Sequence, residues 1–192
     1  MTKRLWLIRH GPTHAKTMVG WTDLAADLSD TAALNRLGDA LPSSAHMISS
    51  DLSRAKSTAD SIPAGRLRLP HDPNLRELHF GAWEDRTFAD IDAETPDHLR
   101  AFWETPGPIA PPDGESWNDL RARTDTAIDQ LIAEGPEDIA IVCHFGPVLT
   151  QIQRALDLDA VAAFRIRIDP LSLTIIERHE GAWSVRGINW RP

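Results

Sequence analysis

The chain has 192 residues, of which 42% are hydrophobic and 25% are charged, a composition ordinary for a soluble globular protein. Its formal net charge of -8 argues against a general nucleic-acid binder, because such a protein needs a basic face to meet phosphate backbones. The single cysteine, Cys143, excludes an intramolecular disulfide and offers no zinc-ligand spacing.

The length fits one domain, residues 1–192, with room for a modest insertion. Lys3 and Arg4 precede an apolar run that Arg9 interrupts, and this run is too short for a signal peptide or a membrane span. We therefore expect a cytoplasmic protein that binds neither membrane nor nucleic acid. A small anionic substrate stays possible, because a local cluster of arginines outweighs a distant negative surface.

Strands and helices alternate along most of the chain, with strands predicted near 3–9, 45–49, 66–69 and 138–143. Helices are predicted near 29–41, 52–62, 88–91, 96–104, 116–133 and 146–156, the first capped by Ser29 or Asp30 and the second by Ser50 or Asp51. Period-two apolar spacing predicts tail strands at 164–168, 171–177 and 183–188, with a hairpin at Gly181 between the last two.

This alternation predicts an α/β protein, a three-layer α/β/α sandwich with a mostly parallel sheet. Between Glu77 and Glu115 the pattern loosens, and short helical pieces alternate with proline- and glycine-containing turns. We interpret this stretch, about 77–115, as a small cap insertion over one end of the sheet.

Polar groups follow two of the apolar strands directly. Arg9 and His10 end the first strand, and His144 ends the strand at 138–143. Parallel sheets form their sites just beyond the carboxyl ends of their strands. Arg54 lies in the first turn of the helix after the second strand, where free backbone N–H groups also favour an anion. These groups predict a pocket for a dianion, most naturally a phosphoryl group.

Five ordered blocks resemble the histidine phosphatase superfamily, also called the phosphoglycerate mutase-like family. The first is Arg9-His-Gly-Pro-Thr13, and the others are residues 49–59, residues 75–84, Asp113-Gly-Glu-Ser116 and Val142-Cys-His-Phe-Gly146. One block alone is a weak signal. Together they span nearly the whole chain in the family's order.

The resemblance implies a role for each matching residue. His10 attacks phosphorus and becomes a phosphohistidine, and Glu77 protonates the departing oxygen before taking a proton from the hydrolytic water. Arg9, Arg54 and His144 hold the phosphoryl oxygens, His144 as a cation. These cations supply the charge that Mg²⁺ would supply, so the resemblance implies neither a metal nor another cofactor. Glu84, seven positions after Glu77, is the rival acid.

Three further residues are expected to contact the substrate. Thr13 offers a hydroxyl donor, Lys16 stands where the family often has a phosphate-binding asparagine, and Phe145 follows His144 where a glycine is more usual. Four cap and helix aromatics either line the substrate mouth or pack the cap: Trp83, Phe102, Trp103 and Trp117.

The sequence favours a metal-independent phosphomonoesterase that acts on a small phosphorylated metabolite. A cofactor-dependent phosphoglycerate mutase is one alternative, although mutases of the family place an arginine directly after the acid, where this chain has Leu78. A non-catalytic phosphate-binding protein is the other, and the pair His10 and Glu77 argues against it. The identity of the phosphate ester and the oligomeric state are not indicated.

Overall fold

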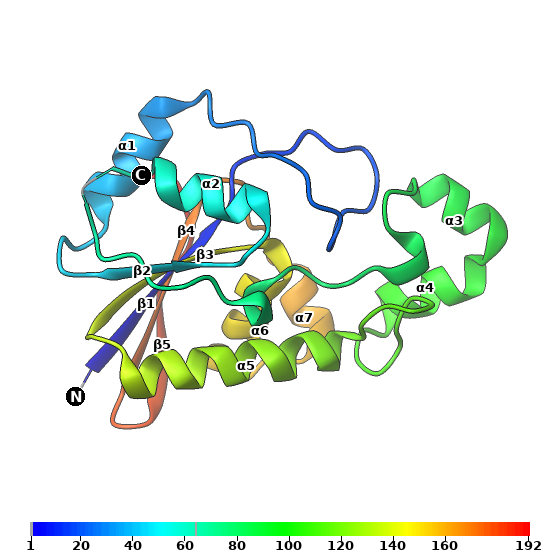
Figure 1. Ribbon diagram of the computed structural model, residues 1–192. Helices are drawn as coiled ribbons and strands as arrows, with labels where there is room; N and C mark the ends of the chain where they lie inside the picture. Colours follow the sequence, from blue (N-terminus) through cyan, green and yellow to red (C-terminus); the bar gives the residue numbers. More distant parts are fainter. Residues whose placement is uncertain (1, 64) are drawn as a thin grey trace.

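The computed structural model describes residues 2–63 and 65–192. Its strands form one sheet in the order β2-β3-β1-β4-β5 (Figure 1). The strands are β1 (Thr2–Arg9), β2 (His46–Ser49), β3 (Asp138–Cys143), β4 (Leu173–His179) and β5 (Ala182–Trp190). The helices are α1 (Thr31–Ala40), α2 (Ser53–Ser61), α3 (Phe88–Glu94), α4 (Pro96–Glu104), α5 (Trp117–Glu134), α6 (Phe145–Leu156) and α7 (Ala160–Phe164), with 3₁₀ turns η1 (Pro73–Leu75) and η2 (Gly81–Trp83).

Helices cover both faces of the sheet, as predicted for a layered α/β protein. Alternate side chains of β1 enter two separate buried clusters: Leu5 and Leu7 pack on the side of α5 and α6, and Ile8 packs on the side of α1 and α2 (Figure 1). Because successive side chains of a strand point to opposite faces, a strand that is apolar throughout needs a helical layer on each face.

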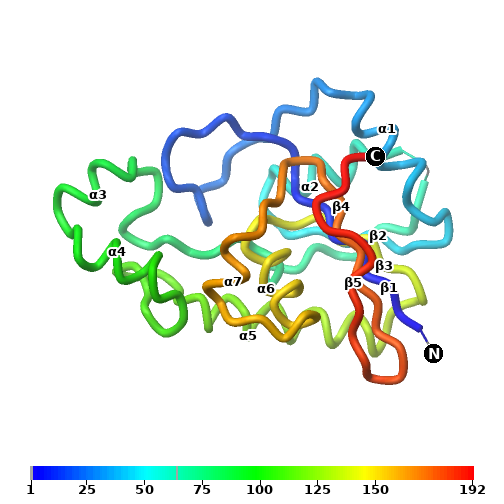
Figure 2. The backbone as a smooth tube through the Cα atoms, turned by 180° about the vertical axis from the view of Figure 1, so that it is seen from behind, coloured from blue at the N-terminus to red at the C-terminus, as the bar shows by residue number. Residues whose placement is uncertain are grey.

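The expectation of a mostly parallel sheet is wrong, because the sheet is mixed. β3 pairs in parallel with β1 and with β2, whereas β4 runs antiparallel to β1 and β5 antiparallel to β4. After α7 the chain returns to the carboxyl end of β1, where Arg9 N–H donates to the Ser172 carbonyl. β4 must therefore start from that end, and the hairpin at Gly181 (φ 88°) then sends β5 back along the outer edge (Figure 2).

Three local predictions also need correction. Residues 66–69 form one isolated bridge, Met47 to Arg68, and not a strand. Residues 164–168 form no strand, because α7 extends to Phe164. The start of α2 is capped by neither Ser50 nor Asp51: the Asp23 carboxylate accepts from the Ser53 N–H and hydroxyl instead.

The insertion at 77–115 carries α3 and α4 out to one side of the sheet (Figure 1). Its Ile91, Leu99 and Phe102 nevertheless belong to the same buried cluster as Leu5 and Leu7 of the sheet. This shared core supports the prediction of one domain.

If the insertion and the sheet fold as one unit, Phe102→Ala should lower the free energy of unfolding by about 3–5 kcal/mol, because it empties a core site, and unfolding should stay a single transition. Phe88→Ala in the exposed α3 side chain should change it by less than about 0.5 kcal/mol. Urea unfolding followed by tryptophan fluorescence and by circular dichroism measures both. Two separate transitions in the wild type would contradict one domain.

Candidate active site

The register of β1 and β3 places the two strand-end histidines side by side. Arg9 lies opposite Cys143, and the His10 N–H extends the ladder by donating to the Cys143 carbonyl at 3.0 Å. The rings of His10 and His144 stand 4.9 Å apart between centroids, edge to face. The two histidines predicted at the strand ends therefore lie side by side at the carboxyl edge of the sheet.

Arg54 joins this pair from the neighbouring strand connection. It is the second residue of α2, which follows β2, and its Nε–H lies 3.2 Å both from His10 Nε2 and from His144 Nδ1. Its two terminal nitrogens donate to the carbonyls of Thr22 and Gly20 at 2.9 and 2.5 Å. Burial lowers the pKa of Arg54, but an arginine starts so high that it stays cationic.

The surroundings of His10 determine which ring nitrogen carries the proton and which carries the lone pair. Nδ1 lies 2.6 Å from the Gly11 carbonyl, which accepts only from an N–H, so the proton sits on Nδ1 and the lone pair is on Nε2. Burial, and then the charges of Arg54 and Arg9, lower the pKa of His10 to about 3. At neutral pH the ring is an unprotonated nucleophile with Nε2 facing Arg54.

The expectation that His144 is a cation is wrong for the unliganded site. Burial, together with the charges of Arg54, Arg123 and Arg9 and that of His10 whenever it is protonated, lowers the pKa of His144 well below its ordinary value. Its Nδ1 accepts from Arg54, so its proton sits on Nε2, which has no hydrogen-bond partner among the described residues. His144 is thus a neutral ring with one buried, unused donor.

Arg9 adds a second cation and a second unused donor. One terminal nitrogen donates to the Ile168 carbonyl at 2.6 Å, and the guanidinium carbon lies 5.4 Å from the centroid of the Phe145 ring. Its Nε is buried without a partner among the described residues. Burying donors without partners is costly, which favours a ligand that accepts from them.

Glu77 lies against the first turn of α6. Its Oε1 accepts from the N–H groups of Leu78 and Gly146 at 2.9 and 3.0 Å. Burial raises the pKa of this carboxyl, and the two N–H groups and the charges of Arg54 and Arg9 only partly offset the effect. A carboxyl that holds its proton more firmly than usual is suited to general-acid chemistry.

Glu84, the rival acid, has a different role. Its carboxylate accepts from the N–H groups of Gly20, Trp21, Thr22 and Phe80 and from the Thr22 hydroxyl, at 2.7 to 3.1 Å. Burial alone would raise the pKa of Glu84, but these donors outweigh it and lower the pKa. The ionised group fastens the loop at 20–22, whose carbonyls hold Arg54.

Of the three residues predicted to contact the substrate, only Phe145 lies beside a residue of the histidine–arginine cluster. Phe145 lies beside Arg9, as described above. In the described part of the chain, the side chains of Thr13 and Lys16 make no hydrogen bond or ion pair, and Lys16 is exposed. Both therefore stay predictions for a liganded state.

The aromatic residues of the cap mainly pack the core. Trp83, Phe102 and Trp117 are buried, whereas Trp103 is only partly so. A cavity of about 50 Å³ beside Glu77 is lined by apolar and aromatic groups: Leu78, Phe80, Trp103, Trp117, Phe145, Gly146 and Phe164. Cys143 lies in the core, where burial raises its pKa, so it is no nucleophile.

Sequence reasoning missed two residues that touch this site, Arg123 and Glu115. The Arg123 guanidinium donates to the Glu77 carbonyl at 2.8 Å and pairs with Glu115. The block around Glu115 was a visible signal, but its partner lies eight positions further along a helix that carries no other motif residue.

Within residues 2–63 and 65–192, no group of three or more histidine, cysteine, aspartate or glutamate side chains is arranged to hold a metal ion. No helix in the same ranges is long and apolar enough to cross a bilayer.

Two strand-end histidines, two arginines and a carboxyl whose pKa is raised by burial form a site suited to phosphoryl transfer. The chain belongs to the histidine phosphatase superfamily (branch 1), whose family model matches residues 5–191. The predicted family is confirmed.

A bifunctional protein of Mycobacterium tuberculosis is 34% identical over 97% of this chain, which spans 53% of that protein, about half its length. The adenosylcobalamin/alpha-ribazole phosphatase of Salmonella typhimurium is 28% identical, with 98% of this chain and 99% of that protein covered. The solved mycobacterial glucosyl-3-phosphoglycerate phosphatase superposes with a TM-score of 0.85 at 26% identity, covering 99% of this chain and 100% of the other. The last two of these relatives are named as phosphatases.

Gly146→Ala should displace the acid without unfolding the protein. An added Cβ would lie 2.3 Å from Glu77 Oε1, the mobile end of a side chain, and 2.8 Å from a Leu120 methyl. We expect phosphatase activity to fall about 10- to 100-fold, as when a catalytic group is misplaced, with thermal unfolding shifted by only a few degrees. Equal activity in the variant would contradict the placement of Glu77.

His10 should make the protein less stable in acid. Its pKa is lowered from its ordinary value to about 3, so its contribution to stability is complete above pH 6.5 and is lost as pH falls towards 3, by up to about 1.4 kcal/mol per pH unit. His10→Asn should show a shallower loss than the wild type in urea unfolding between pH 7 and pH 4. Parallel curves for the two proteins would contradict the lowered pKa.

Proposed function

We propose that this protein is a metal-independent phosphomonoesterase that passes the phosphoryl group through His10. The observation that carries the proposal is the convergence of His10 Nε2 and His144 Nδ1 on one Arg54 N–H. An unprotonated nucleophilic nitrogen faces a fixed cation and a second imidazole, and all three side chains are buried. A phosphoryl group entering between them would meet its nucleophile and its positive donors together.

Charge supports a dianion in this pocket. Arg54 is a buried cation and Arg9 a partly buried one, and neither forms an ion pair with a carboxylate among the described residues. Arg9 Nε and His144 Nε2 are buried donors without partners in those residues. A phosphoryl group supplies the missing negative charge and the missing acceptors. Its charge would also favour protonation of His144, so the expected cation belongs to the liganded state.

In the first half-reaction, the His10 Nε2 lone pair forms a bond to phosphorus while the bond to the ester oxygen breaks. The proton of Glu77 passes to that oxygen, so the alcohol leaves neutral. The His10 ring gains positive charge as the N–P bond forms. Its Nδ1–H already donates to the Gly11 carbonyl, and this contact stabilises the charge.

In the second half-reaction, a water attacks phosphorus opposite His10. The Glu77 carboxylate takes a proton from this water, the N–P bond breaks with its electron pair returning to Nε2, and inorganic phosphate leaves. The site returns to its starting state, with His10 neutral and Glu77 protonated. No step requires a group that these residues do not provide.

Hydrolysis is better supported than a mutase reaction, although a curated relative from Serratia proteamaculans bears the name "Probable phosphoglycerate mutase". A mutase must hold a carboxylated substrate beside the acid. Here Leu78 follows Glu77 and is buried, and the small cavity beside Glu77 is lined by no cationic side chain among the described residues. An apolar lining does not bind a carboxylate.

The proposed substrate is a small phosphorylated metabolite in the cytoplasm. The relatives named above as phosphatases of α-ribazole and of glucosyl-3-phosphoglycerate make those two esters the first candidates in a substrate panel.

The purified protein should hydrolyse p-nitrophenyl phosphate in the presence of EDTA, because its own cations meet the phosphoryl charge. His10→Ala should abolish this activity, since it removes the imidazole nitrogen that attacks phosphorus. Released phosphate measures turnover, and quenching in alkaline detergent during turnover should trap an acid-labile, alkali-stable phosphoprotein in the wild type alone.

His71→Ala is a matched control, because His71 is an exposed histidine that bonds to Ser49 on the edge of the sheet. It should keep wild-type activity. Full activity in His10→Ala, or activity that EDTA removes, would end the proposal. Strict dependence on a bisphosphoglycerate primer would favour the mutase.

A further inference from the structure

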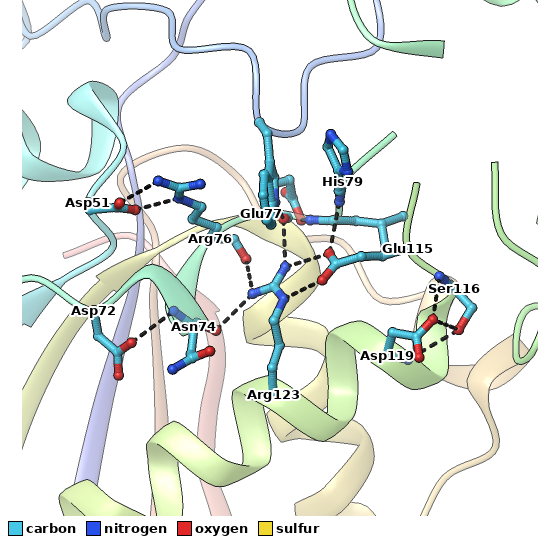
Figure 3. Close-up of polar contacts among 12 residues, drawn as sticks. Asp51, Asp72, Asn74, Arg76, Glu77, His79, Glu115, Ser116, Asp119 and Arg123 are labelled. Atoms are coloured by element: carbon cyan, nitrogen blue, oxygen red, sulfur yellow. Dashed lines mark hydrogen bonds and ion pairs between the residues drawn. The ribbon is translucent and has the colours of Figure 1, made fainter. Parts of the chain in front are cut away.

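Glu77, the proposed catalytic acid, belongs to a short backbone segment, residues 74–77, that the Arg123 side chain contacts from outside the site. Arg123, in the second turn of α5, donates to the carbonyls of Asn74, Arg76 and Glu77, each at 2.8 Å (Figure 3). The Asn74 carbonyl belongs to η1, and those of Arg76 and Glu77 belong to the loop that leaves η1. Three acceptors within four residues leave this loop little freedom to shift.

Arg123 is itself fixed. Glu115 receives its Nε and one terminal nitrogen at 2.7 and 2.8 Å, a bidentate pair, and both side chains are less than a fifth exposed (Figure 3). Glu115 Oε2 also accepts from the His79 N–H, while the Glu115 N–H donates to the His79 carbonyl. Glu115 therefore has two contacts with this segment. It bonds to the backbone of His79, just after Glu77, and it holds the Arg123 guanidinium, which bonds to the backbone up to Glu77.

The start of α5 makes this support rigid. Ser116 caps the helix, and Asp119 returns the contact to the Ser116 N–H, so both members of a capping box are present (Figure 3). Arg123 lies one turn further along the same helix. The capped start of α5 is thus connected to the backbone of Glu77 in two steps: Glu115 pairs with Arg123, and Arg123 donates to three backbone carbonyls.

We propose that Arg123, held by Glu115, is the positioning residue for Glu77 in phosphoryl transfer. This inference rests on the proposed function. Glu77 reaches the Gly146 N–H only from the place its backbone now occupies, and the site tolerates little displacement because Gly146 and Glu77 Oε1 are already in close contact. Arg123 makes no hydrogen bond to His10 or Arg54, and its hydrogen bonds act on the backbone that carries Glu77. Its charge also lowers the pKa of His144, and Arg123→Lys keeps that charge.

The test compares two leaving groups. An alkyl alcohol leaves only with a proton, whereas p-nitrophenolate leaves well without one, so a misplaced acid slows an alkyl phosphate selectively. Glu77→Gln, which removes the acid itself, shows how far kcat falls for each of the two substrates when proton donation is lost. Arg123→Gln should lower kcat for an alkyl phosphate by about 10- to 100-fold and for p-nitrophenyl phosphate by less than about threefold, with little change in KM. Arg123→Lys, which keeps the charge and part of the donors, should lie between.

Arg66→Gln is the matched control. Arg66 also donates to several backbone carbonyls, all of them outside the site: that of Gly38 in α1 and those of Leu41, Pro42 and Pro63 in loops. A structural loss there should slow both substrates alike or neither. An equal loss on both substrates in Arg123→Gln and Arg123→Lys would overturn the inference, as would wild-type kinetics in both.

Amide hydrogen exchange tests the inference without activity. The Gly146 N–H has the Glu77 carboxylate as its acceptor, so its exchange should become at least about tenfold faster in both Arg123 variants and stay unchanged in Arg66→Gln. Unchanged Gly146 exchange in the Arg123 variants would overturn the inference. A wild-type protein without phosphatase activity would remove the proposed function, while this measurement would still decide whether Arg123 places Glu77.

Discussion

The parallel register between β1 and β3 is the constraint on which the site depends. It aligns Arg9 with Cys143, so the next residue of each strand is a histidine at the same level of the sheet edge. A shift of one residue would turn one ring to the opposite face of the sheet. The register is held by apolar side chains on both faces, Leu5, Leu7 and Ile8 among them, and so the packing of the core sets the distance between two catalytic rings.

The buried Arg54 and the partly buried Arg9 then need an environment that keeps them charged and still leaves them free for a ligand. The structure gives Arg54 backbone carbonyls as partners in place of a carboxylate, and the ionised Glu84 holds those carbonyls from behind. A carboxylate in direct contact would neutralise the pocket. Glu84, one loop removed, stabilises Arg54 and leaves its charge available to a phosphoryl group.

Much of this was predictable because strands and motif residues are local signals. Residues 139–143 are apolar throughout, and the strand predicted at 138–143 has the observed bounds. The direction of β4 was not predictable from its own alternating pattern, because pairing direction depends on where the preceding connection returns the chain. In the site, Arg9, His10, Arg54, Glu77 and His144 were identifiable by type and order, but the protonation of His144 was not. It depends on the number of cations that the fold buries beside the ring, which the sequence does not reveal.

The two glutamates show why position outweighs residue type. Glu77 and Glu84 lie seven residues apart in one block, and both lie against backbone N–H groups. Glu77 receives two such groups and has a raised pKa, whereas Glu84 receives four and a hydroxyl, and its pKa is lowered. The difference in donors leaves one group as a proton carrier and makes the other a permanent anion. The N–H groups come from loops 20–22 and 78–80 and from α6. The packing of these segments against one another therefore determines which of the two glutamates can act as the acid.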